Sequence, residues 1–304
     1  MTAGLMKPSQ LGSTDRPVED KQPRDRWDRP LIYVPDKPKL VPYTRCTTFI
    51  DVIEDKTNLT KWNKRMVLVG ATKAPRLVNE AAVLDPVDDK KKLDKLAEEL
   101  VTVAGAHVKR EKGSHLHDLS EYVDRGEPLP PCTEADLADM AAYKAATVDL
   151  TVVDAERLVV VDEIKVAGTP DRVSFYDGPG PGAVCPGMGW PEWICGNLIT
   201  DLKTGSMEYG ELKMAMQLSV YSRGMFYDWK TQTRTPLPDV NQEWGLIINL
   251  PAGSAKCEIH WINLSEGWKA VQVAREVREA RRKKKILVPF QPGARTPDLA
   301  EPGV

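Results

Sequence analysis

The sequence has no long apolar run, and this absence limits where the protein can act. Nowhere in its 304 residues is there a stretch approaching the roughly 18 apolar residues that a membrane-spanning helix needs. The first residues also lack the apolar core of a signal peptide. We therefore expect a cytoplasmic protein without a membrane partner.

Cysteine pairs, a strong net charge and a nucleotide-binding loop are missing as well. The five cysteines are scattered and form no CxxC pair, which favours free thiols over a disulfide framework. The formal net charge of −2 means that any contact with nucleic acid must come from a local basic patch. The GxxxxGK phosphate loop is also absent, so we expect no P-loop motor.

Composition divides the chain into a leader, a folded body and a tail. Residues 1–42 contain seven prolines and many charges, so we expect a disordered or extended leader. Four of its apolar residues could still lie along the body: Trp27, Leu31, Ile32 and Tyr33. We expect residues 43–290 to form a single domain, with a helical part in 43–150 and a catalytic sheet core in 151–290. Residues 291–304 are expected to form a flexible tail.

Hydrophobic periodicity and turn residues predict helices first, then strands mixed with helices. The expected helices are a pair within 44–69, then 88–104, one through 113 to about 126, one from Thr133, 206 to about 227, and 265 to about 285. The expected strands are 158–166, 168–176, 193–203, 243–250 and 256–262. The lysines of 88–104 fit a solvated face better than a DNA patch. This order predicts an α/β fold with a mixed sheet flanked by helices.

Asp201 and Lys203 are the first candidates for chemistry, because alternate residues of a strand point to the same face. They would project together while Leu202 points into the core. Such a pair is either an ordinary ion pair or a carboxylate that holds a cation beside an ammonium that orients water. Asp171, near the start of the preceding strand, favours the second interpretation, since neighbouring strands lie about 4.8 Å apart. Hard oxygen ligands with one imidazole suit Mg²⁺ or Mn²⁺.

Gln217 and Tyr221 stand one helical turn apart on the helix that follows. Together with Lys213 they form a line at four-residue steps. Polar residues aligned beside such a site are candidates for positioning phosphate or water. Polar groups that are satisfied at the edge of the core are the alternative interpretation.

Four motifs in this order resemble the PD-(D/E)xK nuclease superfamily and, within it, the RecB-like exonuclease family. They are Gly113-(three residues)-His117, Pro170-Asp171, Asp201-Leu202-Lys203 and Gln217-(three residues)-Tyr221. The opening at Thr44-Arg45, with Leu59 and Trp62, is also similar, so the resemblance spans residues 44–227. It implies a restriction-endonuclease-like core and a Mg²⁺- or Mn²⁺-dependent deoxyribonuclease, an exonuclease rather than an endonuclease.

The resemblance also implies a role for each motif residue. It assigns the metal to three side chains and one main-chain carbonyl: His117, Asp171, Asp201 and Leu202. Lys203 would position or activate the attacking water, and Gln217 and Tyr221 would support the site and touch DNA. The related CRISPR-associated nucleases hold an iron–sulfur cluster on one early and three late cysteines. Only Cys257 follows the last motif here, so we expect no such cluster.

A basic cluster near the C-terminus is the best candidate for contact with the DNA backbone. Seven of residues 275–285 are Lys or Arg, including Arg281, Arg282 and Lys283. Contacts to phosphate do not depend on base sequence, and no base-reading motif is visible, so we expect linear DNA ends to be bound with low sequence specificity. A solvated helix end is the alternative interpretation.

Together these features predict a metal-dependent DNA exonuclease that serves recombination, repair or DNA processing, with a phage or bacterial origin suggested by the resemblance alone. Without a motor, it would act on free ends or with a recombinase, a helicase or a single-strand-binding protein. The rival hypothesis is a catalytically silent DNA-binding or scaffolding protein with the same fold. The complete set of His117, Asp171, Asp201 and Lys203 argues against that rival.

Overall fold

The structure is a computed structural model that describes residues 21–205, 207 and 210–290, except for the side chains of residues 109 and 110. The beginning of the expected leader, the tail 291–304 and Ser206, where a helix was expected to start, lie outside the described residues. Within the described residues, no helix combines the length and the apolar character needed to cross a bilayer.

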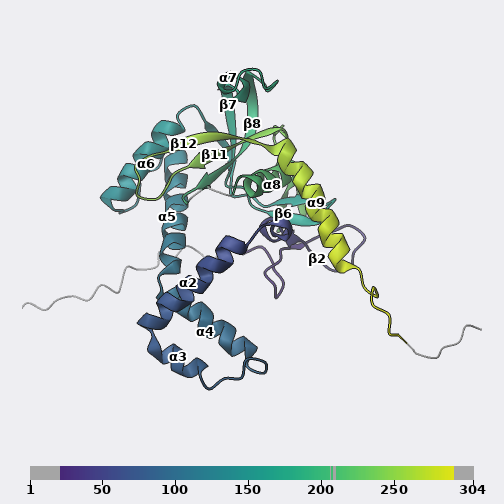
Figure 1. Cartoon of the computed structure of the whole chain (residues 1–304). Helices are drawn as coiled ribbons and strands as arrows, with labels where there is room; N and C mark the ends of the chain where they lie inside the picture. The colour runs from purple at the N-terminus through teal and green to yellow at the C-terminus, as the bar shows by residue number, and fades with distance from the viewer. Residues whose placement is uncertain (1–20, 206, 208–209, 291–304) are drawn as a thin grey trace, which may run out of the picture.

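A five-stranded mixed sheet forms the centre of the molecule (Figure 1). Its strands are, in order across the sheet, β12 (Glu258–Asn263), β11 (Trp244–Asn249), β8 (Trp193–Lys203), β7 (Arg172–Pro179) and β4 (Thr151–Ala155). β8 and β11 run parallel, whereas the other neighbours are antiparallel. The expected mixed α/β class is therefore confirmed, and β8 has the predicted bounds.

Two helical layers cover this sheet because its strands alternate apolar side chains between both faces. Leu202 of β8 packs into a cluster with Leu116 of α5 (Ala106–Asp124) and Met140 of α6 (Glu134–Ala146). On the opposite face Ile199 lies in a cluster with residues of α8 (Glu211–Tyr221) and α9 (Leu264–Arg282). The layers hold α5 and α8 on either side of β8, where the candidate site residues are.

Close packing between α8 and α9 depends on a glycine. A Cβ on Gly267 would lie 2.2 Å from the Ala215 carbonyl oxygen, a distance that no side chain can occupy without moving a helix. Asn263 caps α9 by accepting a hydrogen bond from the Glu266 amide. Thr133 caps α6, with a full capping box to Asp136.

A second sheet lies beside the first and contains two departures from the sequence prediction. Its order is β10 (Thr233–Pro236), β9 (Met225–Asp228), β5 (Val159–Val161), β6 (Val166–Gly168) and β3 (Thr44–Arg45). The expected strand 158–166 is two short antiparallel strands, joined by a turn in which Lys165 adopts a left-handed φ of 51°. The expected helix to residue 227 ends at Tyr221, and the chain continues into the β9–β10 hairpin.

Packing explains why α8 stops early. A Cβ on Gly224 would lie 2.2 Å from the Val159 Cγ1 atom, so the chain runs against β5 at this point. Met225 and Phe226 then pair with β5, which places Phe226 in the core. A long-range strand partner therefore overrides the local helical pattern.

The β7–β8 hairpin is longer than the sequence predicted. Strand β7 begins at Arg172 rather than Gly168, and it continues beyond residue 176 through Asp177 and Gly178, which pair with β8. The Gly/Pro-rich tip contains one short helix, α7 (Pro181–Val184). Figure 1 shows this hairpin extending beyond the body.

The described part of the leader lies along the second sheet. Two short strands, β1 (Leu31–Ile32) and β2 (Val41–Pro42), pair with each other. Ile32 is 0% exposed, and the Tyr33 amide donates to the Tyr227 hydroxyl. Trp27, in contrast, is 59% exposed, so Ile32 rather than the tryptophan anchors this segment.

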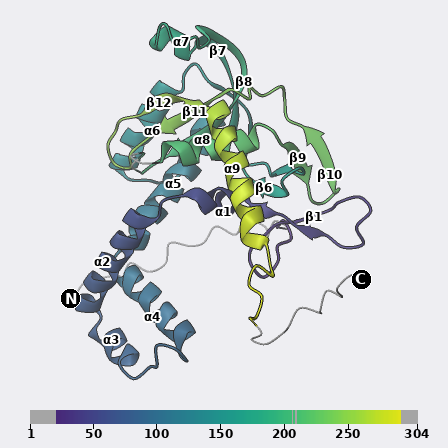
Figure 2. The ribbon, with the colours of Figure 1, turned by 45° about the vertical axis from the view of Figure 1, so that its right-hand side comes forward.

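A helical arm projects from the body, as Figures 1 and 2 show. It follows α1 (Cys46–Ile50) and the 3₁₀ turn η1 (Asp51–Ile53), and consists of α2 (Thr57–Lys73), α3 (Pro75–Ala81) and α4 (Lys90–Val103). We call residues 57–103 the arm. Helix α5 leads from the arm back to the sheet (Figure 2), so the arm connects directly to the element that carries His117.

Candidate active site

Two antiparallel strands bring the predicted carboxylates together. Arg172 of β7 pairs with Thr200 of β8, and the next step of this register sets Asp171 opposite Asp201. Opposite residues of an antiparallel pair project to the same face. The Asp171 Oδ2 atom also accepts a hydrogen bond of 2.8 Å from the Leu202 amide. The main chain of β8 therefore fixes the position of Asp171.

Asp201 and Lys203 point to one face of β8, as the alternation predicted. The Lys203 Nζ atom lies 2.5 Å from Asp201 Oδ2. Asp201 is 2% exposed, and its Oδ2 atom has no aligned hydrogen-bond donor among the described residues. Burial, followed by the negative charge of Asp171, raises the pKa of the Asp201 carboxyl to about 7, although Lys203 opposes this effect.

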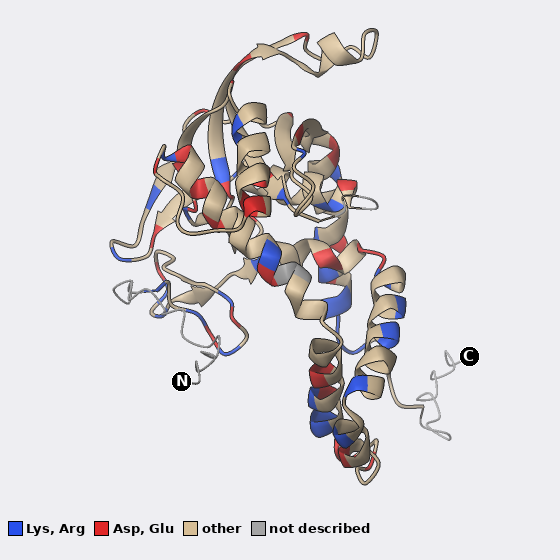
Figure 3. Ribbon diagram, turned by 90° about the vertical axis from the view of Figure 1, so that its left-hand side faces the viewer, with Lys and Arg blue, Asp and Glu red and all other residues tan. Residues whose placement is uncertain are grey.

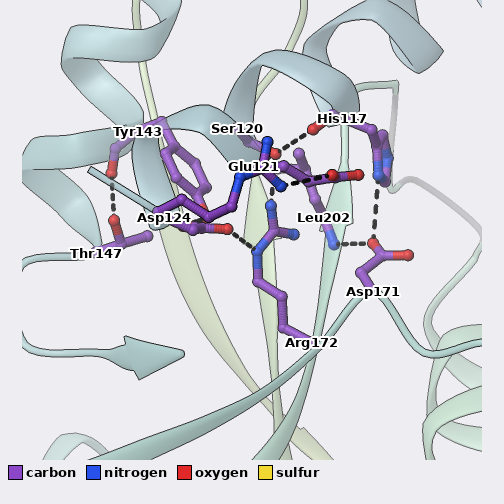
Figure 4. Close-up of polar contacts among 10 residues, drawn as sticks. His117, Ser120, Glu121, Asp124, Tyr143, Thr147, Asp171, Arg172 and Leu202 are labelled. Atoms are coloured by element: carbon purple, nitrogen blue, oxygen red, sulfur yellow. Dashed lines mark hydrogen bonds and ion pairs between the residues drawn. The ribbon is translucent and has the colours of Figure 1, made fainter. Parts of the chain in front are cut away.

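His117 reaches Asp171 from α5 (Figure 4). Its Nδ1 atom lies 3.5 Å from Asp171 Oδ2. Gly113 allows this approach, because a Cβ there would lie 2.7 Å from the Thr204 Oγ1 atom just after β8. His115 instead faces α6, where it lies 3.4 Å from Asp136. The structure thus places His117, and not His115, beside Asp171.

A buried arginine ties α5 to β7 next to these residues (Figure 4). The Arg172 guanidinium donates to Asp124 Oδ2 and to the Ser120 hydroxyl, each over 2.5 Å. The Tyr143 hydroxyl of α6 donates to the other Asp124 oxygen over 2.7 Å. Ser120 and Asp124 share a helix face with His117, at steps of three and seven residues. This network therefore sets the position of α5, and with it the imidazole.

Sequence reasoning missed these positioning residues, although a signal was present. Arg172 follows Asp171 directly and is charged at a strand position that alternation turns inward. It is 3% exposed. A buried arginine needs an acidic partner. The sequence offered one clue to that partner, because Asp124 shares a face of α5 with His117 and Ser120.

Gln217 and Tyr221 occupy the predicted face of α8, with Gln217 Nε2 donating to the Tyr221 hydroxyl over 3.3 Å. Tyr221 is 3% exposed, and burial raises its pKa well above the usual value. Such burial is incompatible with the expected contact of Tyr221 with DNA. The hydroxyl lies beneath the site, against Gly168 and Cys46, where it can support the strands but does not face solvent.

Lys213, one turn earlier on α8, is turned away from the site. Its ammonium lies 2.8 Å from both Asp51 and Glu54, at the start of the arm. Glu163, an acidic residue in the β5–β6 turn, pairs with Arg275 of α9. Neither residue belongs to the carboxylate cluster.

Glu156 is an acidic neighbour that the sequence did not reveal. Its amide donates to the Asp171 carbonyl over 3.2 Å, and it adopts a left-handed φ of 52°. The residue is exposed overall, but the surroundings of its carboxyl restrict solvent. This desolvation, and then the charges of Asp171 and Glu121, raise the pKa of Glu156 to about 7. Only the fold brings it beside Asp171.

The basic residues near the end of α9 fall into two groups. Arg275 and Arg278 are tied to the body, through Glu163 and through the Thr48 carbonyl. Arg281, Arg282 and Lys283 are exposed at the helix end. They are available to a polyanion, but their contact with DNA stays a prediction.

The donor set fits a hard divalent cation in its chemistry. The described residues hold no group of three or more His, Cys, Asp or Glu side chains arranged to hold an ion. Asp201 is nevertheless a buried carboxylate next to a second one, Asp171, and only the Lys203 ammonium approaches its Oδ2 atom among the contacts of the described residues. A cation would relieve the repulsion between the two acids.

A cavity of about 370 Å³ lies beside Glu156. Glu156 and Thr169 form part of its wall, together with Arg24, Tyr227 and Trp229. A larger cavity of about 670 Å³ lies elsewhere, between the helices of the arm and α5. Neither cavity is lined by His117, Asp171, Asp201 or Lys203.

Comparison of the sequence with protein-family models finds no match, and comparison with curated proteins finds none either.

Proposed function

We propose that this protein is a metal-dependent deoxyribonuclease, with a restriction-endonuclease-like core of the RecB-like kind, and that it acts as an exonuclease. One observation carries the proposal. Asp201 is a buried carboxylate next to Asp171, and its Oδ2 atom is approached by the Lys203 ammonium from the same strand face. A purely structural ion pair has no need of a second carboxylate that raises the cost of burying the first.

Each residue then has a defined task. Asp171, Asp201 and His117 would hold Mg²⁺ or Mn²⁺, with the Leu202 carbonyl as a further oxygen. When bound, the ion withdraws charge from a phosphate and lowers the pKa of bound water. Lys203 keeps an ammonium beside Asp201, where it can orient water and stabilise negative charge that develops on the phosphate. Arg172 and Asp124 hold α5 in place.

The choice of an exonuclease over an endonuclease rests on the resemblance of the four motifs to the RecB-like exonucleases. The cavity beside Glu156 does not bear on this choice, because His117, Asp171, Asp201 and Lys203 do not line it.

Lys203→Ala should keep metal and DNA binding but reduce cleavage by about 10²–10³-fold, the usual effect of removing one preorganised donor. Degradation of end-labelled linear and circular DNA with Mn²⁺ or EDTA measures this. Lys269→Ala, at an exposed position of α9 that pairs with Glu266, is the matched control and should cleave like wild type.

The same assay distinguishes the nuclease from a silent scaffold. Loss of linear DNA that requires Mn²⁺ supports the enzyme, and cutting of circles would indicate an endonuclease. If wild type binds DNA tightly but degrades none under any metal condition, the rival function as a DNA-binding or scaffolding protein replaces the proposal. Unchanged turnover in the Lys203 variant would remove only the role given to that lysine.

A further inference from the structure

An apolar groove lies between the edge strand β12 and helix α8, and the site described above does not use it. Strand β12 ends the central sheet, and no strand among the described residues pairs with its outer side. The groove has a volume of about 450 Å³, within the range of about 300–1,000 Å³ for sites that bind ligands. Its apolar lining is Leu212, Met214, Ala215, Ile247, Trp261 and Ile262. We call it the β12 groove.

The β12 groove has the two parts that addition of a strand requires. A peptide that adds to a sheet edge gains main-chain hydrogen bonds from the edge strand and specificity from pockets for its alternate side chains. Strand β12 offers six residues of edge backbone. Its His260 and Ile262 are opposite Ile247 and Gly245 of β11, and Ile247 packs in the cluster under α8. These two side chains therefore face α8, and the groove between them and the helix is open to an extended segment.

The end of the chain contains an exposed segment that suits this groove. Residues 286–290 read Ile-Leu-Val-Pro-Phe, and we call them the apolar segment. Ile286, Leu287, Val288 and Phe290 are each between 75% and 92% exposed. Isoleucine, valine and phenylalanine favour the extended conformation of a strand. Large apolar side chains exposed in one continuous run mark a contact surface.

Pro289 determines how the apolar segment pairs. Proline has no amide to donate, so within a sheet it lies where its edge of the strand faces solvent. Because alternate residues of a strand direct their amides to opposite edges, Ile286, Val288 and Phe290 are the residues that pair with β12. Their three side chains share one face of the strand and enter the groove together.

The apolar segment cannot lie along β12 of its own chain. Helix α9 begins directly after β12, and its 19 residues span about 28 Å at 1.5 Å per residue. Beyond Arg282, the last residue of α9, an extended chain returns by at most about 14 Å at Ile286 and about 22 Å at Val288. Figures 1 and 2 show the chain after α9 leading away from the sheet. A second copy of the chain must therefore supply the segment.

Local charge favours the same pairing. Three exposed lysines, residues 283–285, directly precede the apolar segment. Glu211 and Glu266 line the groove, and Glu258 is exposed at the start of β12; Lys269 offsets only Glu266. The molecule as a whole carries both signs of charge (Figure 3) and a net charge of −2. Attraction between two copies therefore depends on such local clusters.

We propose that two copies of this chain exchange their apolar segments, and that each segment adds as a strand to β12 of the other copy and fills its groove. Reciprocal exchange of an identical element closes a two-fold dimer. It covers an open sheet edge and an exposed apolar run, both of which otherwise favour aggregation. The proposal goes beyond the nuclease function and does not depend on it.

The mass of the full chain in solution, measured by size-exclusion chromatography with light scattering, tests the proposal. Wild type should have the mass of two chains. Val288→Asp in the apolar segment and Leu212→Asp in the groove should each have the mass of one chain, because a charge would be buried in an apolar contact. Leu212 is 54% exposed. Val83→Asp and Leu137→Asp, at side chains 84% and 50% exposed, are the matched controls and should remain dimers. Circular dichroism confirms that all four variants fold.

A mixture of the two interface variants tests the exchange itself. Val288→Asp keeps an intact groove and Leu212→Asp keeps an intact segment, so one of the two contacts can form between them. We expect the mixture to form a dimer that neither variant forms alone, with a weaker affinity than wild type. Hydrogen exchange locates the contact: amides of residues 258–263 should exchange more slowly in wild type than in Val288→Asp, because hydrogen-bonded amides are protected.

Several results would overturn the proposal. Wild type that stays a monomer up to its limit of solubility would exclude the dimer. A dimer that survives Val288→Asp or Leu212→Asp would use another surface. A mixture that stays monomeric, or exchange at β12 that is the same in wild type and Val288→Asp, would exclude the exchange of strands. None of these results bears on metal-dependent cleavage, which is measured separately.

Discussion

Asp201→Asn is expected to abolish metal-dependent cleavage and, at the same time, to stabilise the metal-free protein. Cleavage should fall by at least about 10³-fold, since the ion contributes several kcal/mol to the transition state. Stability should rise because burial and Asp171 disfavour the ionised carboxyl more than Lys203 favours it, as the raised pKa of about 7 shows. A residue kept for structure alone would show the opposite effect on stability.

The pH dependence has a definite sign. Below about pH 4 the carboxyl is protonated in both folded and unfolded chains, so wild type and variant should be about equally stable. Between about 4 and 7 the unfolded chain releases a proton that folded Asp201 retains, so wild type loses stability relative to the variant. Above about pH 7 the difference is constant and at most about 4 kcal/mol, at about 1.4 kcal/mol per pKa unit.

Thermal unfolding in EDTA and in Mn²⁺ checks both effects. Wild type should unfold at a higher temperature when Mn²⁺ is added, because ligand bound to the folded state stabilises it, whereas Asp201→Asn should not respond. Asp149→Asn, the same substitution at an exposed position, is the control and should behave like wild type. A variant that is less stable than wild type in EDTA at pH 8, or that still gains stability from Mn²⁺, would contradict the metal site.

The sequence was enough to predict those features of the site that depend on the local periodicity of a strand or a helix. Alternation along β8 was enough to place Asp201 and Lys203 on one face and Leu202 in the core. A four-residue step was enough to align Gln217 with Tyr221. Both rules depend only on backbone geometry, so they hold whatever the element packs against.

Contacts between distant segments could not be predicted in the same way. Glu156 comes near Asp171 only through a left-handed residue after β4, and no sequence pattern marks that bend. The β9–β10 hairpin depends on β5 as a partner, and local propensity extended α8 through it. The burial of Tyr221 depends on Gly168 and Cys46, which pack against it from other elements. These three features were not predicted for the same reason: each depends on tertiary packing between distant segments.

The Arg172 network leads to a second large effect, this time on folding. Arg172→Met should lower the free energy of unfolding by about 3–5 kcal/mol, because it leaves the Asp124 carboxylate without its cation in a buried setting. Asp124 keeps only the Tyr143 hydroxyl as a donor among the contacts described here. Urea unfolding in EDTA gives the value directly. Arg125→Met, which breaks exposed pairs with Glu121 and Glu127, should cost at most about 1 kcal/mol.

A double variant distinguishes two causes of the lost stability: the unpaired Asp124 carboxylate and the lost packing of the Arg172 side chain. Arg172→Met with Asp124→Leu removes both ions, and replacing a buried pair with apolar groups is often close to neutral. We therefore expect the double variant to be more stable than Arg172→Met alone, with a coupling energy of about 2 kcal/mol or more. Additive losses would show that Arg172 acts through its aliphatic stem and the Tyr143 ring rather than through Asp124. In that case the position of His117 would depend on the helix packing of α5 against α6, and not on the ion pair between α5 and β7.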